Sequence, residues 1–174
     1  MMASAGQVTE IGIVLYPGVQ RAAVHGLTDL FDIANRYAAT TQNRSRLRVT
    51  HWSLAEVSDV RLSRVYPSDA QTSQNPAVLI LPPTLVDLPD RKICEIISGW
   101  LFEQHANGIL LVSVCSGIFL IAQAGLLRGR TVSTHRICAQ ILSDTYPTIT
   151  VDTDRRMIDH ADILPAKFRL PRVK

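Results

Sequence analysis

The chain is 174 residues long, and 47% of its residues are hydrophobic while 19% are charged. This composition excludes an intrinsically disordered chain, and the length is typical of one globular domain with a sizeable core. The net charge of +3 arises at the C-terminal end, because the segment from Arg155 to Lys174 carries six basic and two acidic residues. The remainder is slightly acidic, so the charge does not indicate a nucleic-acid-binding surface.

The 3 cysteines are an odd number at wide spacing, which matches no disulfide framework and no zinc motif. We therefore expect no metal, no cofactor and a reducing cytoplasm as the compartment. The first ten residues lack the basic and apolar regions of a signal peptide. Gly108 to Leu127 carries no charge, but Cys115-Ser116-Gly117 interrupts it, which favours a buried strand and helix over a membrane span.

The N-terminal part of the chain predicts strands and a helix. We expect a strand over Val8–Tyr16, a turn at Pro17-Gly18 and a helix over Val19–Tyr37, in which apolar residues recur at steps of three and four. Leu47–Leu54 predicts a second strand, and Val60–Tyr66 a weaker one.

The middle of the chain continues the alternation. Ala77–Leu81 predicts a buried strand that Pro82-Pro83 ends, and Asp90–His105 predicts an amphipathic helix. Further on, Thr134 is expected to cap a short helix that runs through Asp144.

The stretch from Ile109 to Leu120 carries the strongest functional signal. A strand of six mostly apolar residues runs into Cys115-Ser116-Gly117, and an apolar helical pattern follows at once and ends near Gly125. This is the sequence form of a nucleophile elbow, in which a sharp strand-to-helix turn lifts one side chain above a parallel sheet. The positive end of a helix dipole favours the thiolate of a cysteine at that point. His135 follows as a candidate base or acid.

Short strands at Ile149–Val151 and Met157–Leu164 complete the pattern, which predicts an α/β fold with a mainly parallel sheet. Ligands on such sheets bind at the carboxyl ends of the strands. The segments Tyr16–Gly18, Pro82–Thr84 and Cys115-Ser116 all lie just past strand ends. We therefore expect the three segments to form one ligand-binding rim.

These residues resemble the ThiJ/PfpI branch of the class I glutamine amidotransferase-like superfamily, and most of all the N-terminal sensory domain of AraC-type transcriptional regulators. The resemblance covers about residues 8–163. The matching segments are Leu15–Gln20, Gly26–Phe31 with Ala34-Asn35, Cys115–Leu127, Gly129-Arg130 leading to Ser133–His135, and Tyr146-Pro147. The resemblance implies a three-layer sandwich around the parallel sheet, a flavodoxin-like arrangement.

Two departures from the enzymes of this branch bear on activity. Enzymes such as isonitrile hydratase pair the elbow cysteine with an acid, and the matching position here is Ala23. They also tend to have Pro-Gly-Gly after the third strand, where a backbone N–H helps to hold an oxyanion. Here the tripeptide is Pro82-Pro83-Thr84, and because proline has no N–H, Thr84 is left as the donor.

The sequence therefore favours a ligand-sensing, non-catalytic domain of an AraC-type regulator. The ligand-binding residues expected are Tyr16, Pro17, Pro83, Thr84, Cys115, Ser116 and His135, of which Cys115 and His135 are a vestigial catalytic pair. The partners expected are a small molecule and a second copy, with no membrane and no specific DNA binding by this chain alone. The alternatives are a cysteine-dependent hydrolase or hydratase of the isonitrile hydratase type, and a cysteine redox sensor.

The expected domain organisation is a sensory domain over residues 1–163, incomplete at its C-terminal end, and a basic tail over residues 164–174 that is disordered or out of frame. The resemblance implies that family members continue with a long helix and that full regulators add a helix-turn-helix domain. The sequence after Ile163 resembles neither.

Overall fold

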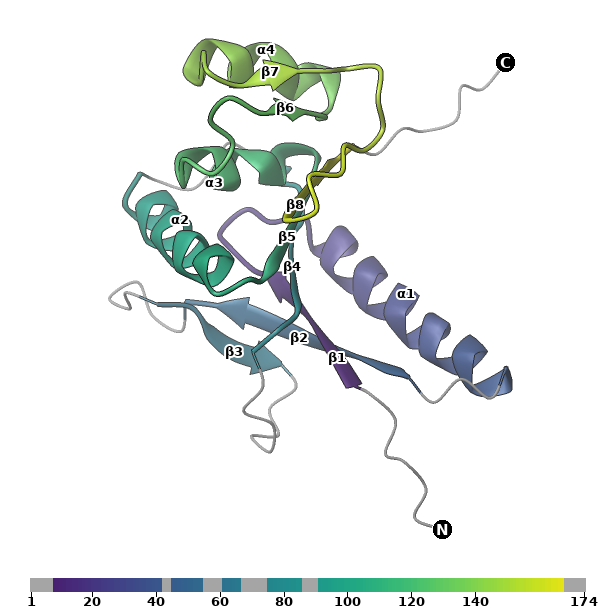
Figure 1. Cartoon of the computed structure of the whole chain (residues 1–174). Coiled ribbons are helices and arrows are strands. Elements are labelled where there is room, and N and C mark those ends of the chain that lie inside the picture. Colours follow the sequence, from purple (N-terminus) through teal and green to yellow (C-terminus); the bar gives the residue numbers. More distant parts are fainter. Residues whose placement is uncertain (1–7, 42–44, 55–60, 67–74, 86–90, 168–174) are drawn as a thin grey trace.

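Figure 1 shows the computed structural model, which describes residues 8–41, 45–54, 61–66, 75–85 and 91–167. A six-stranded sheet in the order β3-β2-β1-β4-β5-β8 forms its centre. Neighbouring strands pair in parallel except for the antiparallel pair β2–β3. The strands are β1 (Val8–Val14), β2 (Arg46–Ser53), β3 (Ser63–Tyr66), β4 (Val78–Leu81), β5 (Leu110–Val114) and β8 (Ile163–Ala166).

Helices lie on both faces of this sheet, with α1 on one face and α2 and α3 on the other (Figure 1). The helices are α1 (Arg21–Thr40), α2 (Arg91–Ala106), α3 (Ile118–Gln123) and α4 (Arg136–Thr145), and a 3-10 turn spans Cys115–Gly117. A small parallel pair, β6 (Thr131–Val132) and β7 (Thr150–Val151), lies beside α4. The predicted α/β sandwich with a mainly parallel sheet is confirmed.

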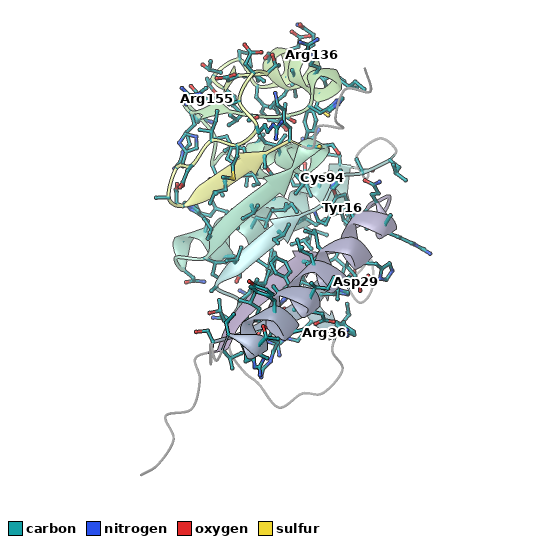
Figure 2. The ribbon with its side chains drawn as sticks, turned by 90° about the vertical axis from the view of Figure 1, so that its right-hand side faces the viewer. Tyr16, Asp29, Arg36, Cys94, Arg136 and Arg155 are labelled. Carbon is teal, nitrogen blue, oxygen red and sulfur yellow. The ribbon has the colours of Figure 1, made fainter. Side chains whose placement is uncertain are left out.

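The core is uneven across the two faces of the sheet. The large cluster lies on the α2 and α3 side, where Leu81, Leu101 and Leu120 are fully buried. On the α1 side a small cluster forms around Ile13 and Val24. Seen from the α1 side in Figure 2, strands β5 and β8 lie beside α1, and no helix of the described residues covers them.

Side chains along β5 alternate between buried and half-buried, as expected for a strand that is covered on one face. Leu111 and Ser113 point to the α2 side and are fully buried, whereas Leu110, Val112 and Val114 are only half-buried. A parallel strand is ordinarily covered on both faces. This half of the sheet is covered on one face by the described residues.

The C-terminal strand differs from the prediction. Instead of one strand over Met157–Leu164, Met157 makes an isolated bridge to Ala166, and β8 begins only at Ile163. A turn separates the two, because an Asp159 carboxylate oxygen accepts a 2.7 Å hydrogen bond from the N–H of Ala161, whose φ is +68°. Residues 164–166, expected in the tail, thus form part of the sheet, while residues 168–174 lie outside the described residues.

One ion cluster fixes the entry into β8. Asp162 accepts two hydrogen bonds from Arg130, at 2.6 and 2.8 Å, and lies 2.9 Å from the Nε2 atom of His105. The Arg130 guanidinium holds the pKa of the Asp162 carboxyl well below its usual range. The cluster ties the end of α2 and the loop before β6 to the start of the edge strand.

The uncharged stretch from Gly108 to Leu127 forms β5, the tight turn and α3. Within the described part of the chain, no helix combines the length and hydropathy that a membrane span requires.

Candidate functional site

The loops that follow β1 and β4 are joined at the carboxyl ends of the strands. The Tyr16 hydroxyl donates a hydrogen bond to the carbonyl oxygen of Pro82, and the N–H of Gln20 donates to that of Pro83 at 2.8 Å. The Thr84 hydroxyl donates to the carbonyl oxygen of Gly18 at 2.9 Å. These bonds hold the two loops in one fixed arrangement.

The loop after β5 joins them through Ser116. The N–H of Thr84 donates a 2.9 Å hydrogen bond to the Ser116 hydroxyl oxygen. The three segments expected at one rim are therefore in contact. The sequence analysis named the N–H of Thr84 as the donor left for an oxyanion after Pro82 and Pro83. This bond to Ser116 already uses that N–H.

The turn at Cys115 has a constrained backbone. Cys115 has a φ of +50°, a left-handed conformation that costs a residue with a side chain about 1–2 kcal/mol. The carbonyl oxygen of Cys115 accepts a 3.0 Å hydrogen bond from the Thr134 hydroxyl. Two residues on, a Cβ atom at Gly117 would lie 2.3 Å from the carbonyl oxygen of Leu81, so this position requires glycine. The turn is thus pressed against the end of β4.

A cavity of about 1040 Å³ opens beside this turn. Its walls come from the first turns of α1, the loop after β4, the end of β5, the start of α4 and the segments around residues 153 and 167. The lining residues are Gln20, Ala22, Ala23, Gly26, Leu27, Pro83, Val114, Cys115, His135, Arg136, Thr153, Asp154 and Lys167.

The structure separates the predicted ligand-binding residues into two groups. Pro83, Cys115 and His135 line the cavity. The others, Tyr16, Pro17, Thr84 and Ser116, are not among its lining residues. Tyr16, Thr84 and Ser116 instead make the hydrogen bonds between the loops.

Tyr16 is the most buried member of the second group. Its residue is 5% exposed and packs in the large core cluster. This burial raises the pKa of its hydroxyl, which therefore stays protonated and remains a hydrogen-bond donor. Tyr16 acts as a structural anchor of the rim.

His135 has a local role that the sequence analysis assigned to its neighbour. The predicted cap Thr134 is wrong: His135 is the N-cap of α4, and its Nδ1 atom accepts a 3.4 Å hydrogen bond from the N–H of Ile137. Thr134 is fully buried, and its hydroxyl donates its hydrogen bond to the carbonyl oxygen of Cys115 instead of capping the helix. With Nδ1 as an acceptor, the neutral imidazole carries its proton on Nε2, so the capping tautomer offers no second basic nitrogen.

The charged residues of the cavity were missed at the sequence level. Arg136 lines it from the start of α4 and Asp154 from the loop after β7. Neither side chain has an ion-pair partner within the described ranges. The Lys167 ammonium donates a hydrogen bond to the carbonyl oxygen of Thr153. These groups come from the start of α4, the loop after β7 and the residue after β8, which only the fold brings together.

The loop that carries Asp154 is held by Asp152. One carboxylate oxygen of Asp152 accepts hydrogen bonds from the N–H groups of Asp154 and Arg155, at 2.8 and 3.1 Å. These two bonds lower the pKa of the Asp152 carboxyl. The Asp-x-Asp spacing is the one signal in the sequence that could have marked this turn.

The cavity lacks the acid that the enzymes of the resembling branch use. Ala23 and Cys115 line the same cavity, and the carboxylate among its described lining residues, Asp154, comes from the segment after β7. Among the described residues, no group of three or more histidine, cysteine or acidic side chains is placed to hold a metal ion.

The sequence was compared with protein-family models and with curated proteins, and it is similar to a transcriptional regulator. No protein-family model matches the sequence. A stretch of 78 residues is 30% identical to the HTH-type transcriptional regulator CdhR of Pseudomonas aeruginosa. The match covers 45% of this chain and 23% of that regulator. The matched stretch thus spans less than a quarter of the length of this relative.

Solved structures match over nearly the whole chain. A candidate transcriptional regulator of Vibrio parahaemolyticus has a TM-score of 0.68 at 18% identity, with 92% of this chain and 84% of that chain covered. An AraC family transcriptional regulator of Pseudomonas putida has a TM-score of 0.67 at 18% identity, covering 91% and 83%. DJ-1beta of Drosophila melanogaster has a TM-score of 0.62 at 17% identity, covering 93% and 83%.

The class that these matches define is the DJ-1/ThiJ/PfpI fold. The ThiJ/PfpI-type domain predicted from the sequence is confirmed at the level of the fold. Transcriptional regulators of the AraC family are among the proteins that share it.

Proposed function

We propose that this chain is the ligand-sensing domain of an AraC-type transcriptional regulator and that its cavity binds a small molecule without converting it. The observation that carries the proposal is the cavity at the strand ends, which has Cys115 in its wall but no acid from α1 beside it. Its volume of about 1040 Å³ suits a metabolite-sized ligand. The similarity to regulators supports the same role.

The charges of the cavity define the class of ligand. Arg136 offers a guanidinium that binds a carboxylate, and Asp154 offers a carboxylate that binds an amine. Ala23, Leu27 and Val114 add an apolar wall. We therefore expect a ligand that carries a carboxylate and a cationic nitrogen, separated by an apolar segment.

A thermal unfolding series tests this expectation. The probes are 4-aminobutanoate, butanoate and butylamine, which differ only in their charged ends. A ligand at roughly 100 times its Kd stabilises a protein by about 2.7 kcal/mol. For a domain of this size that corresponds to a rise in Tm of about 5–10 °C. We expect the zwitterion to raise Tm more than either singly charged probe does.

Two charge-removing variants and two matched controls locate the binding site. Arg136→Gln and Asp154→Asn should abolish the difference between the zwitterion and the singly charged probes. Arg128→Gln and Asp32→Asn remove the same charges at exposed positions outside the cavity and should leave the difference intact. Equal loss in the controls would contradict binding in the cavity.

Alkylation of Cys115 gives an independent readout of occupancy. A ligand in the cavity should slow the reaction of this thiol with iodoacetamide, measured by mass spectrometry of the Cys115 peptide. If a wider panel of zwitterions, anions, cations and neutral amides neither shifts Tm nor slows alkylation, the proposed sensing function is wrong.

A cysteine-dependent hydratase or hydrolase is the second candidate. One observation favours it: Cys115 has the positive φ expected of a nucleophile elbow. However, an acid–base group contributes about 10²–10⁴ to the rate, and an oxyanion donor about 10²–10³. Ala23 is not an acid–base group. Pro83 has no N–H to donate to an oxyanion, and the N–H of Thr84 already donates to Ser116. Turnover of nitriles, isonitriles or amides that Cys115→Ser abolishes would establish this enzyme instead.

A further inference from the structure

Lys167 is a charged residue of the cavity wall that the proposed ligand class does not use. It directly follows β8 and lines the cavity. Its ammonium donates a hydrogen bond to the carbonyl oxygen of Thr153, and it has no ion-pair partner within the described ranges. An ammonium group has three N–H donors, so this bond leaves two of them for a ligand.

The backbone fixes the place of Lys167. Its N–H donates a 2.9 Å hydrogen bond to the carbonyl oxygen of Arg156, and the preceding residue, Ala166, bridges Met157 in an antiparallel pair. The end of β8 is therefore paired with the segment that follows the turn carrying Asp154. Because the backbone and the ammonium of Lys167 are both already held, its binding to a ligand costs little conformational freedom.

Lys167 and Asp154 both belong to this part of the cavity wall but do not form an ion pair. Asp154 follows Thr153, the residue whose carbonyl oxygen binds the Lys167 ammonium. The other acid of the turn, Asp152, already accepts hydrogen bonds from two backbone N–H groups and lies 3.4 Å from the Arg155 guanidinium. A cation and a carboxylate that line one wall without pairing suit a ligand with an ammonium and a carboxylate on one carbon atom.

Arg136 adds a second cation from a different element. It is the first residue of α4, and Figure 2 shows it at the same end of the molecule as Arg155 of the turn. The described lining residues thus carry two cations, Arg136 and Lys167, and one carboxylate, Asp154. A ligand that pairs with all three carries two anionic groups and one cationic group.

We propose that the cavity binds an α-amino dicarboxylate. Asp154 binds the α-ammonium, Lys167 binds the α-carboxylate, and Arg136 binds the carboxylate of the ligand's side chain. This specificity rests on the proposed sensing function and narrows its ligand class, because it adds a second carboxylate on the carbon that carries the nitrogen. Lys167 is the residue that selects for this carboxylate.

Four probes that differ by one charged group test the specificity on the full chain. Glutamate carries all three groups, 4-aminobutanoate lacks the α-carboxylate, pentanedioate lacks the ammonium, and 2-aminobutanoate lacks the side-chain carboxylate. Isothermal titration calorimetry measures each Kd, with both enantiomers where they exist. A missing group leaves one charged side chain of the cavity unpaired, so we expect the better glutamate enantiomer to bind about tenfold more tightly than the other three probes. Aspartate and 2-aminohexanedioate, one carbon shorter and one longer, cover the spacing between the two carboxylates.

Substitutions of Lys167 test the residue that selects. In Lys167→Gln the amide can still donate to Thr153 but has no charge, so the preference for glutamate over 4-aminobutanoate should disappear. Lys167→Arg keeps the charge and should keep the preference. Lys92→Gln removes the same charge from an exposed position of α2 and should leave the preference intact. Arg136→Gln should weaken the binding of both ligands and leave the ratio of their Kd values.

The possible results separate the ligand class from the function on which it rests. If 4-aminobutanoate binds but none of the three amino dicarboxylates binds more tightly, the cavity does not select this class and the sensing function stands. The same conclusion follows if Lys167→Gln keeps the preference, if Lys92→Gln loses it equally, or if only another ligand of the wider panel raises Tm. If nothing in either series binds, the ligand class and the sensing function are both wrong.

Discussion

The two faces of the central sheet differ in what they bury. On one face, α2 buries six of its residues against the sheet and α3. On the other, α1 is the longer helix but has one buried residue, Val24. Residues of α1 line the cavity, and the same helix carries the exposed apolar side chains Leu30, Ile33 and Tyr37. This comparison suggests that the α2 side supplies most of the stability, whereas the α1 side is available for binding.

The sharpest test of this comparison is a pair of matched leucine substitutions. Leu101→Ala removes a fully buried side chain of α2 and should lower the free energy of unfolding by about 2–5 kcal/mol. Leu30→Ala removes a 55% exposed side chain of α1 and should change it by less than about 0.5 kcal/mol at concentrations where the chain is monomeric. Urea denaturation measures both. Similar losses in the two variants would contradict the division of roles.

Gly117→Ala tests how tightly the turn at Cys115 is pressed against β4. The added Cβ would lie 2.3 Å from the carbonyl oxygen of Leu81, a backbone atom that a side-chain rotation cannot relieve. We expect a loss of about 1–3 kcal/mol, typical of overpacking. The displaced turn should also change the rate at which iodoacetamide alkylates Cys115. An unchanged unfolding curve would show that the turn can move freely. Gly99→Ala, where a Cβ meets nothing within 4 Å, is the control.

Much of the fold could be predicted because its strands are encoded in short local patterns. The apolar runs that end at Val14, Leu81 and Val114 each form a parallel strand of the central sheet. The rule that parallel strands share one carboxyl edge then places their loops together. The helix positions followed from periodicity to within a few residues.

The site was less predictable because its side chains depend on long-range contacts. Thr134 has the sequence character of a cap, but burial beside Cys115 gives its hydroxyl another partner, and His135 takes the capping role. Arg136 and Asp154 come together through the path of the chain after β5. No local pattern encodes that path.

The ion cluster at Asp162 links pH to the attachment of the edge strand. Arg130 lowers the pKa of Asp162 in the folded state, so the cluster stabilises the fold above the unfolded carboxyl's pKa of about 3.9. That contribution is lost as the pH falls through the lower folded value. Because the Asp162 side chain is 37% exposed, we expect a contribution of about 1 kcal/mol after solvent screening.

The measurement compares Asp162→Asn with the original chain in urea between pH 7 and pH 2.5. The two free energies of unfolding should differ at pH 7, and the difference should shrink as the pH falls below about 3.9. A difference that stays constant over this range would mean that the carboxyl acts through its shape and not through its charge.

The smallest expected effect, at Gly26, tests the two faces most directly. Alanine there should raise the free energy of unfolding by about 0.5–1 kcal/mol, because it lowers the conformational freedom of the unfolded chain and meets no clash. The same methyl group would project from a residue that lines the cavity and would reduce the space for a ligand. Gly26→Ala should therefore reduce the ligand-induced rise in Tm while the chain itself becomes more stable. Gly99→Ala, which is also helical but is not among the cavity-lining residues, should gain stability and keep the ligand-induced rise in Tm. If both alanine variants gain stability and keep ligand binding, the open space at Gly26 has no binding role.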